Sequence, residues 1–362
     1  MAAAGDTGAA EHTSLSFLDA AGDRLYYRGY DAVELARLAS FEEAAFLLWH
    51  GRLPGAAELA DLRHQLAAAR VLPSAMLAVA AALPRELRPV AAVRTLLSSS
   101  PKPSDAESGG EAIQLTGRIA ALTALVHRHR LGLPPMAAPA ELGQAGSLLA
   151  LLIGLEPDAS RVRALDAALI LHLDLALNAS TYAARVAAST GAELDAAVAA
   201  ALATLEGRLH GGASAEVLAT LERIGTPERA GDYVLQALAR KQRLPGFGHR
   251  HFKGIDPRAV ALKELSRTFA GGGDARLHDV AEALETAMAG ARGLRANVDL
   301  YAATLFHALG FPADLFVLLF AAARVVGWTA HALEQRAEDR VIWPACEYIG
   351  PTPRPLPSRG NP

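Results

Sequence analysis

One segment near the C-terminus, DLFVLLFAAARVVGWTAHAL (residues 314–333), constrains the fold more than any other part of the chain. It reads as a single helix that is apolar on nearly every face, and such a helix is stable only when it is buried. Ala and Leu, both strong helix formers, dominate the 51% of residues that are apolar, whereas aromatic residues make up only 6%. Runs that alternate apolar with polar residues are sparse, so the sequence predicts an almost all-α protein.

Caps and turns mark the other expected elements. Within residues 14–31 two short runs flank an Ala-Gly-Asp turn, which predicts a small β-hairpin and is the one clear strand signal. Ser40, with Glu43 three residues later, predicts a capping box, and Gly51 predicts the end of that helix. Further helices are predicted at 56–70, 73–82, 89–99, 110–131, 160–190 (interrupted before Asn178 and Ser180, either of which can cap a new helix), 193–207, 214–223, 227–241, 257–269, 276–292, 297–309 and 312–337.

Four segments are expected to lie outside helices. Residues 1–12 are small and polar and are expected to be disordered. The stretch 98–111 is rich in Ser, Pro and Gly and predicts an exposed loop, and 131–142 predicts another connection. The Pro-rich tail at 351–362 is expected to be extended.

Composition excludes several classes of function. At 362 residues the chain is long enough for two domains, and its net charge of −3 gives no basis for non-specific binding to nucleic acid. The single cysteine, Cys346, excludes a disulfide within the chain, and no Cys/His spacing typical of a metal site is present. The longest apolar runs are too short to span a bilayer, and the N-terminus lacks a secretory signal. We therefore expect a cytoplasmic protein that does not bind membranes.

The segment LPGFGHRHFKGIDPR (residues 244–258) predicts a loop, because glycines and prolines interrupt it throughout. Its glycines let the backbone come close to a ligand, and His249 lies where this exposed backbone ends. Arg258 follows a proline and can open the next helix. These features indicate either a site for an anionic small molecule or an ordinary polar connection with a surface histidine.

Polar residues interrupt the helical pattern at three other places. His210 precedes two glycines at a helix boundary, as either a ligand-facing ring or an incidental residue of a helix C-cap. Asn297 can cap a helix in whose first turn Asp299 lies, either as a functional carboxylate or only as a favourable helix-start residue. Arg324 lies within the buried helix, where its guanidinium needs a carboxylate from the protein or from a substrate.

Seven segments taken together resemble the citrate synthase family, in whose order they occur between about Ser14 and Gly350. They are YYRGYDAVELA, SFEEAAFLLWHGRLP, LNASTYAARVAAST, GRLHGGASAEVL, LPGFGHRHFKGIDPRA, NVDLYAATLFHALG and AAARVVGWTAHALEQR. The resemblance implies an all-α, citrate synthase-like fold of two domains with the short N-terminal hairpin, working as a homodimer. The expected parts are a disordered N-terminus at 1–13, a large helical domain at 14–211 and 310–350, a small helical domain at 212–309, and an extended tail at 351–362.

The resemblance also implies an activity. Members of this family join an acyl-CoA, usually acetyl-CoA, to a 2-oxo acid, usually the oxaloacetate of the tricarboxylic acid cycle, and then hydrolyse the thioester without a metal or another cofactor. Their catalytic residues match His210, His249 and Asp299. Asp299 would take a proton from the acyl carbon, His210 would hold the enolate oxygen, and His249 would polarise the ketone.

Binding residues follow from the same resemblance. Arg258 and Arg324 match arginines that bind the carboxylates of the oxo acid. Lys253 matches a basic position near the CoA phosphates. The strip on which the CoA adenine rests corresponds to the backbone of Gly246, Phe247 and Gly248.

Two departures from the family's pattern concern the oxo acid. Family members read Asp-His-Glu where this chain has Leu175 in place of the oxaloacetate-binding histidine. They also have an arginine that reaches into the partner subunit's site where this chain has Trp343; Arg340 is a possible substitute, although its side chain would point elsewhere. Each lost charge-assisted hydrogen bond removes about 1.5–3 kcal/mol, so two losses weaken oxaloacetate binding by roughly two to four decades. We expect an oxo acid that is less polar at one end, or poor use of oxaloacetate.

Two other functions are alternatives. The chain could be a non-catalytic paralogue that pairs with an active citrate synthase or senses CoA. The intact His210, His249 and Asp299 argue against this function, whereas Leu175 and Trp343 argue for it. The reverse cleavage of a citryl-type CoA thioester is a third hypothesis.

Overall fold

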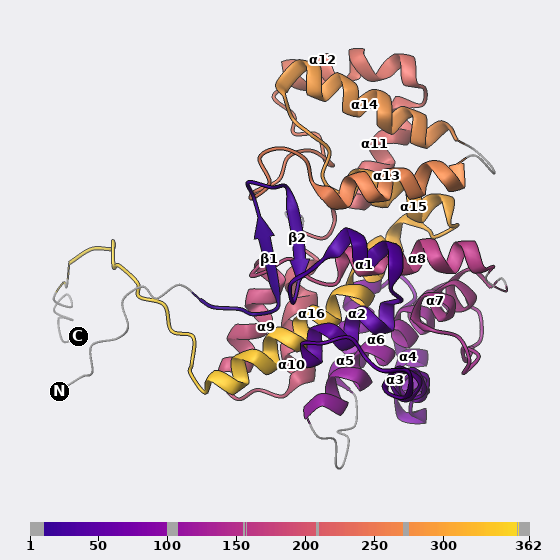
Figure 1. Ribbon diagram of the computed structural model, residues 1–362, viewed down its shortest axis with the longest axis vertical. Coiled ribbons are helices and arrows are strands. Elements are labelled where there is room, and N and C mark those ends of the chain that lie inside the picture. The colour runs from indigo at the N-terminus through magenta and orange to yellow at the C-terminus, as the bar shows by residue number, and fades with distance from the viewer. Residues whose placement is uncertain are drawn as a thin grey trace, which may run out of the picture.

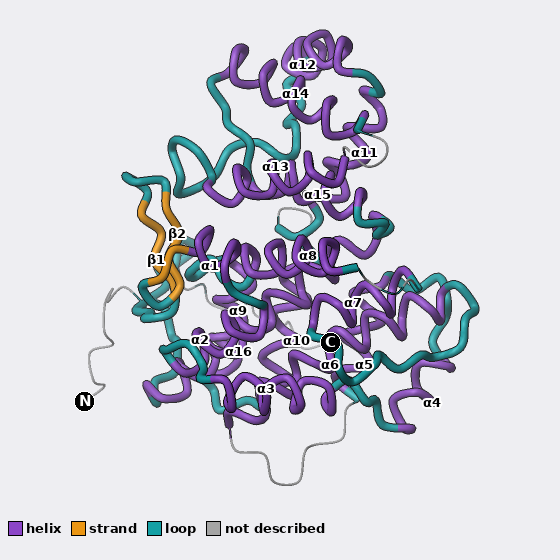
Figure 2. Tube along the Cα trace, turned by 45° about the vertical axis from the view of Figure 1, so that its right-hand side comes forward, coloured by secondary structure: helices purple, strands orange, loops and turns teal. Residues whose placement is uncertain are grey.

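The computed structural model describes residues 11–99, 108–154, 156, 158–207, 210–270, 275–352 and 354. Within these ranges the chain forms sixteen α-helices, two short 3-10 helices and one small sheet, which confirms the all-α prediction (Figures 1 and 2). Residues 1–10 of the N-terminus expected to be disordered, the centre of the loop expected at 98–111 and most of the expected tail fall outside the described residues. Residues 11–13, which that expectation included, are described, and Glu11 lies 3.2 Å from Arg340.

Most predicted helices are present, with ends shifted by a few residues. The strands are β1 Ser16–Asp19, β2 Arg24–Tyr27 and β3 Tyr30–Asp31, and the 3-10 helices are η1 Pro227–Arg229 and η2 Ala313–Leu315. The α-helices are α1 Ala32–Leu38, α2 Phe41–His50, α3 Ala56–Ala69, α4 Ser74–Ala82, α5 Pro89–Ser98, α6 Ser108–Arg130, α7 Gln144–Ile153, α8 Ala159–His172, α9 Ala179–Ser189, α10 Leu194–Leu205, α11 Ala213–Ile224, α12 Ala230–Ala239, α13 Pro257–Ala270, α14 Arg276–Arg292, α15 Val298–Ala308 and α16 Phe316–Glu338.

The predicted hairpin is present, with β1 and β2 antiparallel and Ser16 opposite Tyr27. The two-residue strand β3 adds to β2 and was too short to be predicted. At the tip of the hairpin, Asp23 accepts a hydrogen bond from the backbone amide of Ile255, at 3.0 Å. The hairpin is therefore tied to the loop that precedes α13.

Local signals placed two helix starts correctly. Ser40 and Glu43 form the predicted capping box of α2, which ends at Gly51 in the left-handed conformation, with φ of 76°. Asn178 caps α9, because its side chain accepts a hydrogen bond from the amide of Thr181.

Helix α16 occupies the core, as its apolar sequence predicts. Every residue from Ala321 to Ala332 is buried, and α6, α8, α9 and α10 pack against the helix (Figure 1). The segment Ala313–Glu338 is long and apolar enough to cross a bilayer, but 89% of its most apolar stretch is buried inside the protein. The expectation that every apolar segment is too short to span a bilayer is wrong for this helix. A long helix in the core of a protein can be as long and as apolar as a membrane-spanning helix.

Helices α11 to α15 lie together at one end of the molecule, with α12 and α14 outermost (Figures 1 and 2). The other helices form the larger part around α16. This grouping follows the boundaries expected for a small domain at 212–309, and the division into two domains stays a prediction.

Three features of the fold were not predicted. Helix α1 has only seven residues and follows β3 directly. Helix α7 is buried at eight of its ten residues, so its sequence has no helical period. Helix α6 begins at Ser108, inside the predicted loop, and its Glu111 lies 3.5 Å from Arg336 of α16, so tertiary packing overrides the local signal.

Candidate active site

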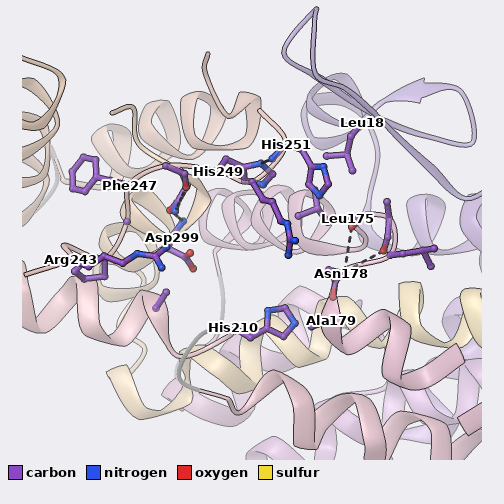
Figure 3. Close-up of a pocket in the computed structure, with 18 of the residues that line it drawn as sticks. Leu18, Leu175, Asn178, Ala179, His210, Arg243, Phe247, His249, His251 and Asp299 are labelled. Carbon is purple, nitrogen blue, oxygen red and sulfur yellow. Dashed lines mark hydrogen bonds between the residues drawn. The ribbon is translucent and has the colours of Figure 1, made fainter. Parts of the chain in front are cut away.

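A cavity of about 920 Å³ brings together segments that are distant in the sequence. Its wall includes Glu11 and Thr13 with β1, the turn before α9, the turn before α11, the loop before α13 and the start of α15. His210, His249 and Asp299 all line it, so the structure gathers the three candidate catalytic residues around one space (Figure 3).

His249 lies in the loop between α12 and α13. Its Nδ1 accepts hydrogen bonds from the backbone amides of His251 and Phe252, both at 3.1 Å. Because Nδ1 is an acceptor, we assign the proton of the neutral ring to Nε2. Burial, with the charge of Arg258 acting in the same direction, lowers the pKa of His249 to about 4. At neutral pH the ring therefore offers an uncharged Nε2–H donor.

The glycine-rich part of this loop is held against the start of α15. Gly246 and Gly248 have φ of 84° and 76°, in the region that favours glycine. A Cβ atom on Gly246 would lie 3.0 Å from the side chain of Val217, so the loop packs closely on α11. Asn297 donates from its backbone amide to the Gly246 carbonyl and from its side-chain Nδ2 to the Gly248 carbonyl, both at 3.0 Å. Phe247 is buried in the core beside this contact.

His210 meets the turn that starts α9. The backbone amide of Ser180 donates to His210 Nε2 at 3.4 Å, and the Ser180 hydroxyl lies 2.8 Å from the same nitrogen. Since an amide can only donate, Nε2 is an acceptor, and we assign the ring proton to Nδ1. Trp328 donates from its indole nitrogen to the Ser180 hydroxyl at 3.2 Å. Burial, aided by the charge of Arg324, lowers the pKa of His210 to about 4, which leaves the ring neutral.

Asp299 lies in the first turn of α15, and the Asn297 side chain accepts a hydrogen bond from its backbone amide at 3.1 Å, which confirms the predicted cap. Ser214 donates from its hydroxyl to Asp299 Oδ1 at 2.7 Å. Burial raises the pKa of Asp299, although the bond from Ser214 and the charge of Arg258 oppose this effect. A carboxylate whose pKa is raised is a stronger base than a free one.

Arg258 lies in the first turn of α13, as predicted, and is 1% exposed. It forms a two-point ion pair with Asp256, from Nε to Oδ1 at 3.0 Å and from Nη2 to Oδ2 at 2.8 Å. Burial opposes ionisation of Asp256, yet the charge of Arg258 holds the pKa of that carboxyl below its ordinary value. Nη2 also lies 3.4 Å from His249 Nε2, which places this guanidinium beside the candidate catalytic ring.

Arg324 is buried as well but lacks such a partner. Its Nε donates to the carbonyl of His172 at 2.6 Å, and its guanidinium lies over the ring of Phe320. Its Nη2 is buried without a hydrogen-bond partner, as is Nε2 of His172, and no carboxylate of the described residues forms an ion pair with Arg324. Burial lowers the pKa of Arg324 to about 10. The charge of Asp174 opposes this shift, but it acts without a direct ion pair, so the described carboxylates leave room for a carboxylate of the substrate.

Leu175 lines the cavity in the turn between α8 and α9 and, in Figure 3, lies near Leu18 of the hairpin. The turn is held from one side by Ser16, which donates to Asp174 Oδ2 at 2.5 Å and accepts from the amide of Ala176 at 2.8 Å. These contacts place two leucine side chains in the wall near His251 (Figure 3).

Five of the expected binding residues lie outside this wall: the buried Arg258 and Arg324 described above, and Lys253, Trp343 and Arg340. Lys253 is exposed in the loop before α13, and Trp343, beyond α16, is 87% exposed. The guanidinium of Arg340 lies 3.2 Å from a carboxylate oxygen of Glu11, which itself lines the cavity. Arg340 therefore does not line the cavity of its own chain but contacts Glu11, a residue that does.

Sequence reasoning missed several residues of the site. Leu18, His251 and Arg243 line the cavity, and Ser214 contacts Asp299. Leu18 had no visible signal, because its role depends on how the hairpin packs. Ser214 lies four residues after His210, and a hydroxyl so near a candidate catalytic turn was the available clue. In the described ranges no group of three or more His, Cys, Asp or Glu side chains is arranged to hold a metal ion.

Comparison with known proteins agrees over nearly the whole chain. The family model described as "Citrate synthase, C-terminal domain" matches residues 6–345. Citrate synthase 2 of Bacillus subtilis is 38% identical over 338 residues, which cover 91% of each chain. A 2-methylcitrate synthase of Mycobacterium tuberculosis is 36% identical over 351 residues, covering 95% of this chain and 89% of the relative.

Solved structures give the same result. Citrate synthase from Thermotoga maritima superposes with a TM-score of 0.88 at 36% identity, covering 95% of this chain and 94% of the other. A ternary complex of citrate synthase from Thermoplasma acidophilum with carboxymethyl coenzyme A and oxaloacetate gives a TM-score of 0.89 at 30% identity, covering 96% and 95%. The chain belongs to the citrate synthase family and is an enzyme of the citrate synthase type.

Proposed function

We propose that this enzyme condenses an acyl-CoA with a 2-oxo acid and then hydrolyses the thioester to release CoA. One observation carries the proposal: His210, His249 and Asp299 line one cavity, the two rings are neutral at pH 7 and the carboxyl is a strengthened base. The relative solved with carboxymethyl coenzyme A and oxaloacetate supports the same pair of substrate classes. No metal or other cofactor takes part in this scheme.

Carbon–carbon bond formation begins at Asp299. Its carboxylate removes a proton from the carbon next to the thioester carbonyl, and the negative charge moves to the thioester oxygen. His210 donates a hydrogen bond from Nδ1 to that oxygen, for which a neutral donor is suited. Such a positioned donor contributes about 3–4 kcal/mol.

The enolate carbon then attacks the ketone of the 2-oxo acid. His249 polarises this ketone by donating from Nε2, and its proton passes to the new alkoxide, which becomes a tertiary alcohol. Arg258 and the unpartnered Nη2 of Arg324 hold the carboxylate next to the ketone. Water finally cleaves the thioester: its oxygen enters the new carboxylate, one of its protons goes to the thiol of CoA and the other returns to His249, while Asp299 releases the proton that it took to solvent. An acyl-CoA, a 2-oxo acid and water thus give a hydroxy acid with one more carboxylate, free CoA and a proton.

The CoA moiety extends along the loop before α13. The backbone of Gly246, Phe247 and Gly248 forms the strip for its adenine, and the space beside Gly248, where a Cβ atom would meet only Leu294 at 3.9 Å, leaves room for a flat ring. Lys253, exposed in the same loop, meets the CoA phosphates. The helices of the 212–309 region act as a small domain that closes over both substrates.

The oxo acid is less polar than oxaloacetate at one end. Leu175 lines the cavity where the family's pattern has a histidine, and Leu18 adds apolar surface (Figure 3). An apolar wall penalises a second carboxylate, which would lose its hydration without a partner.

A homodimer completes the site. Trp343 lies in an extended segment beyond α16, and Tyr348 and Ile349 of that segment are also largely exposed. Contact with the second subunit would bury these side chains and bring Trp343 to the partner's cavity, while Arg340 stays with Glu11.

The test is release of thiol from acetyl-CoA and propionyl-CoA against oxaloacetate, pyruvate and 2-oxobutyrate, with products identified by mass spectrometry. H210A, H249A and D299A should each lower kcat/KM by about 10²–10⁴-fold. H64A changes an exposed histidine and is the matched control. Wild-type rates in all three site variants would refute the assigned roles.

The non-catalytic alternative is favoured by one observation, the apolar Leu175 in the cavity wall. It predicts that the purified protein binds CoA, by calorimetry, yet releases no thiol with any pair of the panel. Turnover with any of these pairs would exclude it.

A further inference from the structure

The hydroxyl of Ser214 is the one side-chain donor in the described part of the chain that bonds directly to the carboxylate of Asp299, with Oγ 2.7 Å from Oδ1. Ser214 is only 4% exposed, so water does not compete freely for this bond. It is the second residue of α11, whereas Asp299 is the second residue of α15. The bond therefore joins the starts of two helices 85 residues apart in the sequence.

This bond does not serve helix capping. The N-cap of α11 is Gly212, and no side chain caps the helix. The two helices also pack without it, since Val217 of α11 and Leu300 of α15 both lie against Gly246. The Ser214 hydroxyl therefore caps no helix, and its one hydrogen-bond acceptor is the Asp299 carboxylate. This indicates that its role concerns that carboxylate.

The bond leaves the two carboxylate oxygens of Asp299 unequal. Oδ1 is occupied by Ser214, and rotation of the carboxylate would break that contact. Asn297 meanwhile fixes the backbone of Asp299 by accepting its amide hydrogen. Oδ2 is then the oxygen free to take a proton from a substrate in the cavity that Asp299 lines.

The turn that carries Ser214 also carries His210. Between them, Gly211 donates its amide to the carbonyl of Leu205 at 2.9 Å, and a Cβ atom at Gly211 would lie 2.7 Å from Leu205. This close packing holds Gly211 against the end of α10. One segment of five residues, 210–214, therefore carries both the candidate enolate donor and the hydroxyl that bonds to the candidate base.

We propose that Ser214 is a positioning residue for this reaction, which holds Asp299 by one oxygen so that the other faces the acyl carbon while His210 faces its oxygen. The inference rests on the proposed role of Asp299 as the base. A positioned carboxylate reacts faster because misplacement by about 1 Å lowers rates by roughly 10²-fold.

The S214A variant tests the proposal, assayed with acetyl-CoA and the fastest 2-oxo acid of the panel. We expect kcat to fall by about 10- to 100-fold with the KM for acetyl-CoA unchanged. Because the lost bond stabilised the ionised carboxylate, the acid limb of the kcat/KM profile should move to higher pH. The kinetic isotope effect with methyl-deuterated acetyl-CoA should increase, since proton removal becomes slower.

Two further variants keep the test decisive. S214T retains a hydroxyl and should recover most of the rate. S214C, a weaker donor of similar size, should have a rate between those of S214A and the wild type, and it serves as the test if S214A folds poorly. T220A is the matched control, because Thr220 has a buried hydroxyl on α11 that bonds only to the carbonyl of Glu216. A wild-type acid limb and isotope effect in S214A and S214C would overturn the proposal. Full activity in D299A would instead overturn the proposed base.

Discussion

Replacing Arg324 with Met is expected to stabilise the free protein while weakening its binding of the 2-oxo acid. The pKa of Arg324 falls from 12.5 to about 10 on burial, and this difference corresponds to about 3 kcal/mol against the charged form. Arginine is protonated at pH 7 in both the folded and the unfolded chain, so the whole penalty reduces stability at that pH.

Met fills a similar volume without a charge, but it removes the bond from Nε to the His172 carbonyl, which is worth about 1.5–3 kcal/mol. The balance leaves R324M more stable by up to about 1.5 kcal/mol, as found when buried charges are replaced by apolar groups. Binding of the oxo acid loses one charge-assisted contact, which corresponds to roughly a 10- to 100-fold rise in KM for that substrate.

Urea unfolding followed by circular dichroism, with and without the oxo acid, measures both effects. At a ligand concentration of about 100 times Kd the wild type gains roughly 2.7 kcal/mol, and R324M should gain little at the same concentration. R185M is the matched contrast, because Arg185 is equally buried but pairs with Glu334 at 2.7 Å and Glu338 at 3.0 Å. Its loss should cost about 3–5 kcal/mol. If R324M is destabilised as much as R185M, the guanidinium of Arg324 does not destabilise the free protein and the reasoning is refuted.

Two other predictions concern the turn before α9. L175H should raise kcat/KM for oxaloacetate relative to that for 2-oxobutyrate by about 10-fold, measured with the two acids in competition. L235H, which changes an exposed leucine of α12, should leave this ratio unchanged. D174N should lower stability, because although burial opposes ionisation, His331 and Ser16 hold the pKa of Asp174 below its ordinary value of 3.8. In the wild type this contribution is present above pH 3.8 and is lost as the pH falls through the lowered value, so the urea midpoints of D174N and wild type should converge in acid and separate at pH 7.

Much of the fold was predictable, because its signals are local. Capping residues such as Ser40 and Asn178 act on amides two or three positions away, and the apolar faces of α16 identify a core helix without knowledge of its neighbours. The start of α6 at Ser108 was not predictable in this way, since it depends on packing against a helix more than 200 residues later.

In the candidate site, too, local features could be predicted and features that depend on distant contacts could not. The residue types and flanking glycines of His210 and His249 indicate chemistry from the sequence alone, and the family resemblance gives them roles. Their protonation states could not be predicted, because the amide that makes His210 Nε2 an acceptor belongs to Ser180, 30 residues away. For Trp343 the expectation of a partner's cavity stays a prediction, since a single chain leaves that side chain in solvent.

The arginines of the site also act on its histidines, which bears on the order of events. Arg258 lowers the pKa of His249 and Arg324 lowers that of His210, so a bound carboxylate that neutralises these charges would favour protonation of both rings. Burial, however, is the larger cause of both lowered pKa values, and a bound oxo acid increases burial. Both rings therefore stay neutral donors when the carboxylate arrives, and the site can receive an anion without losing the protonation states that the enolate and the ketone require.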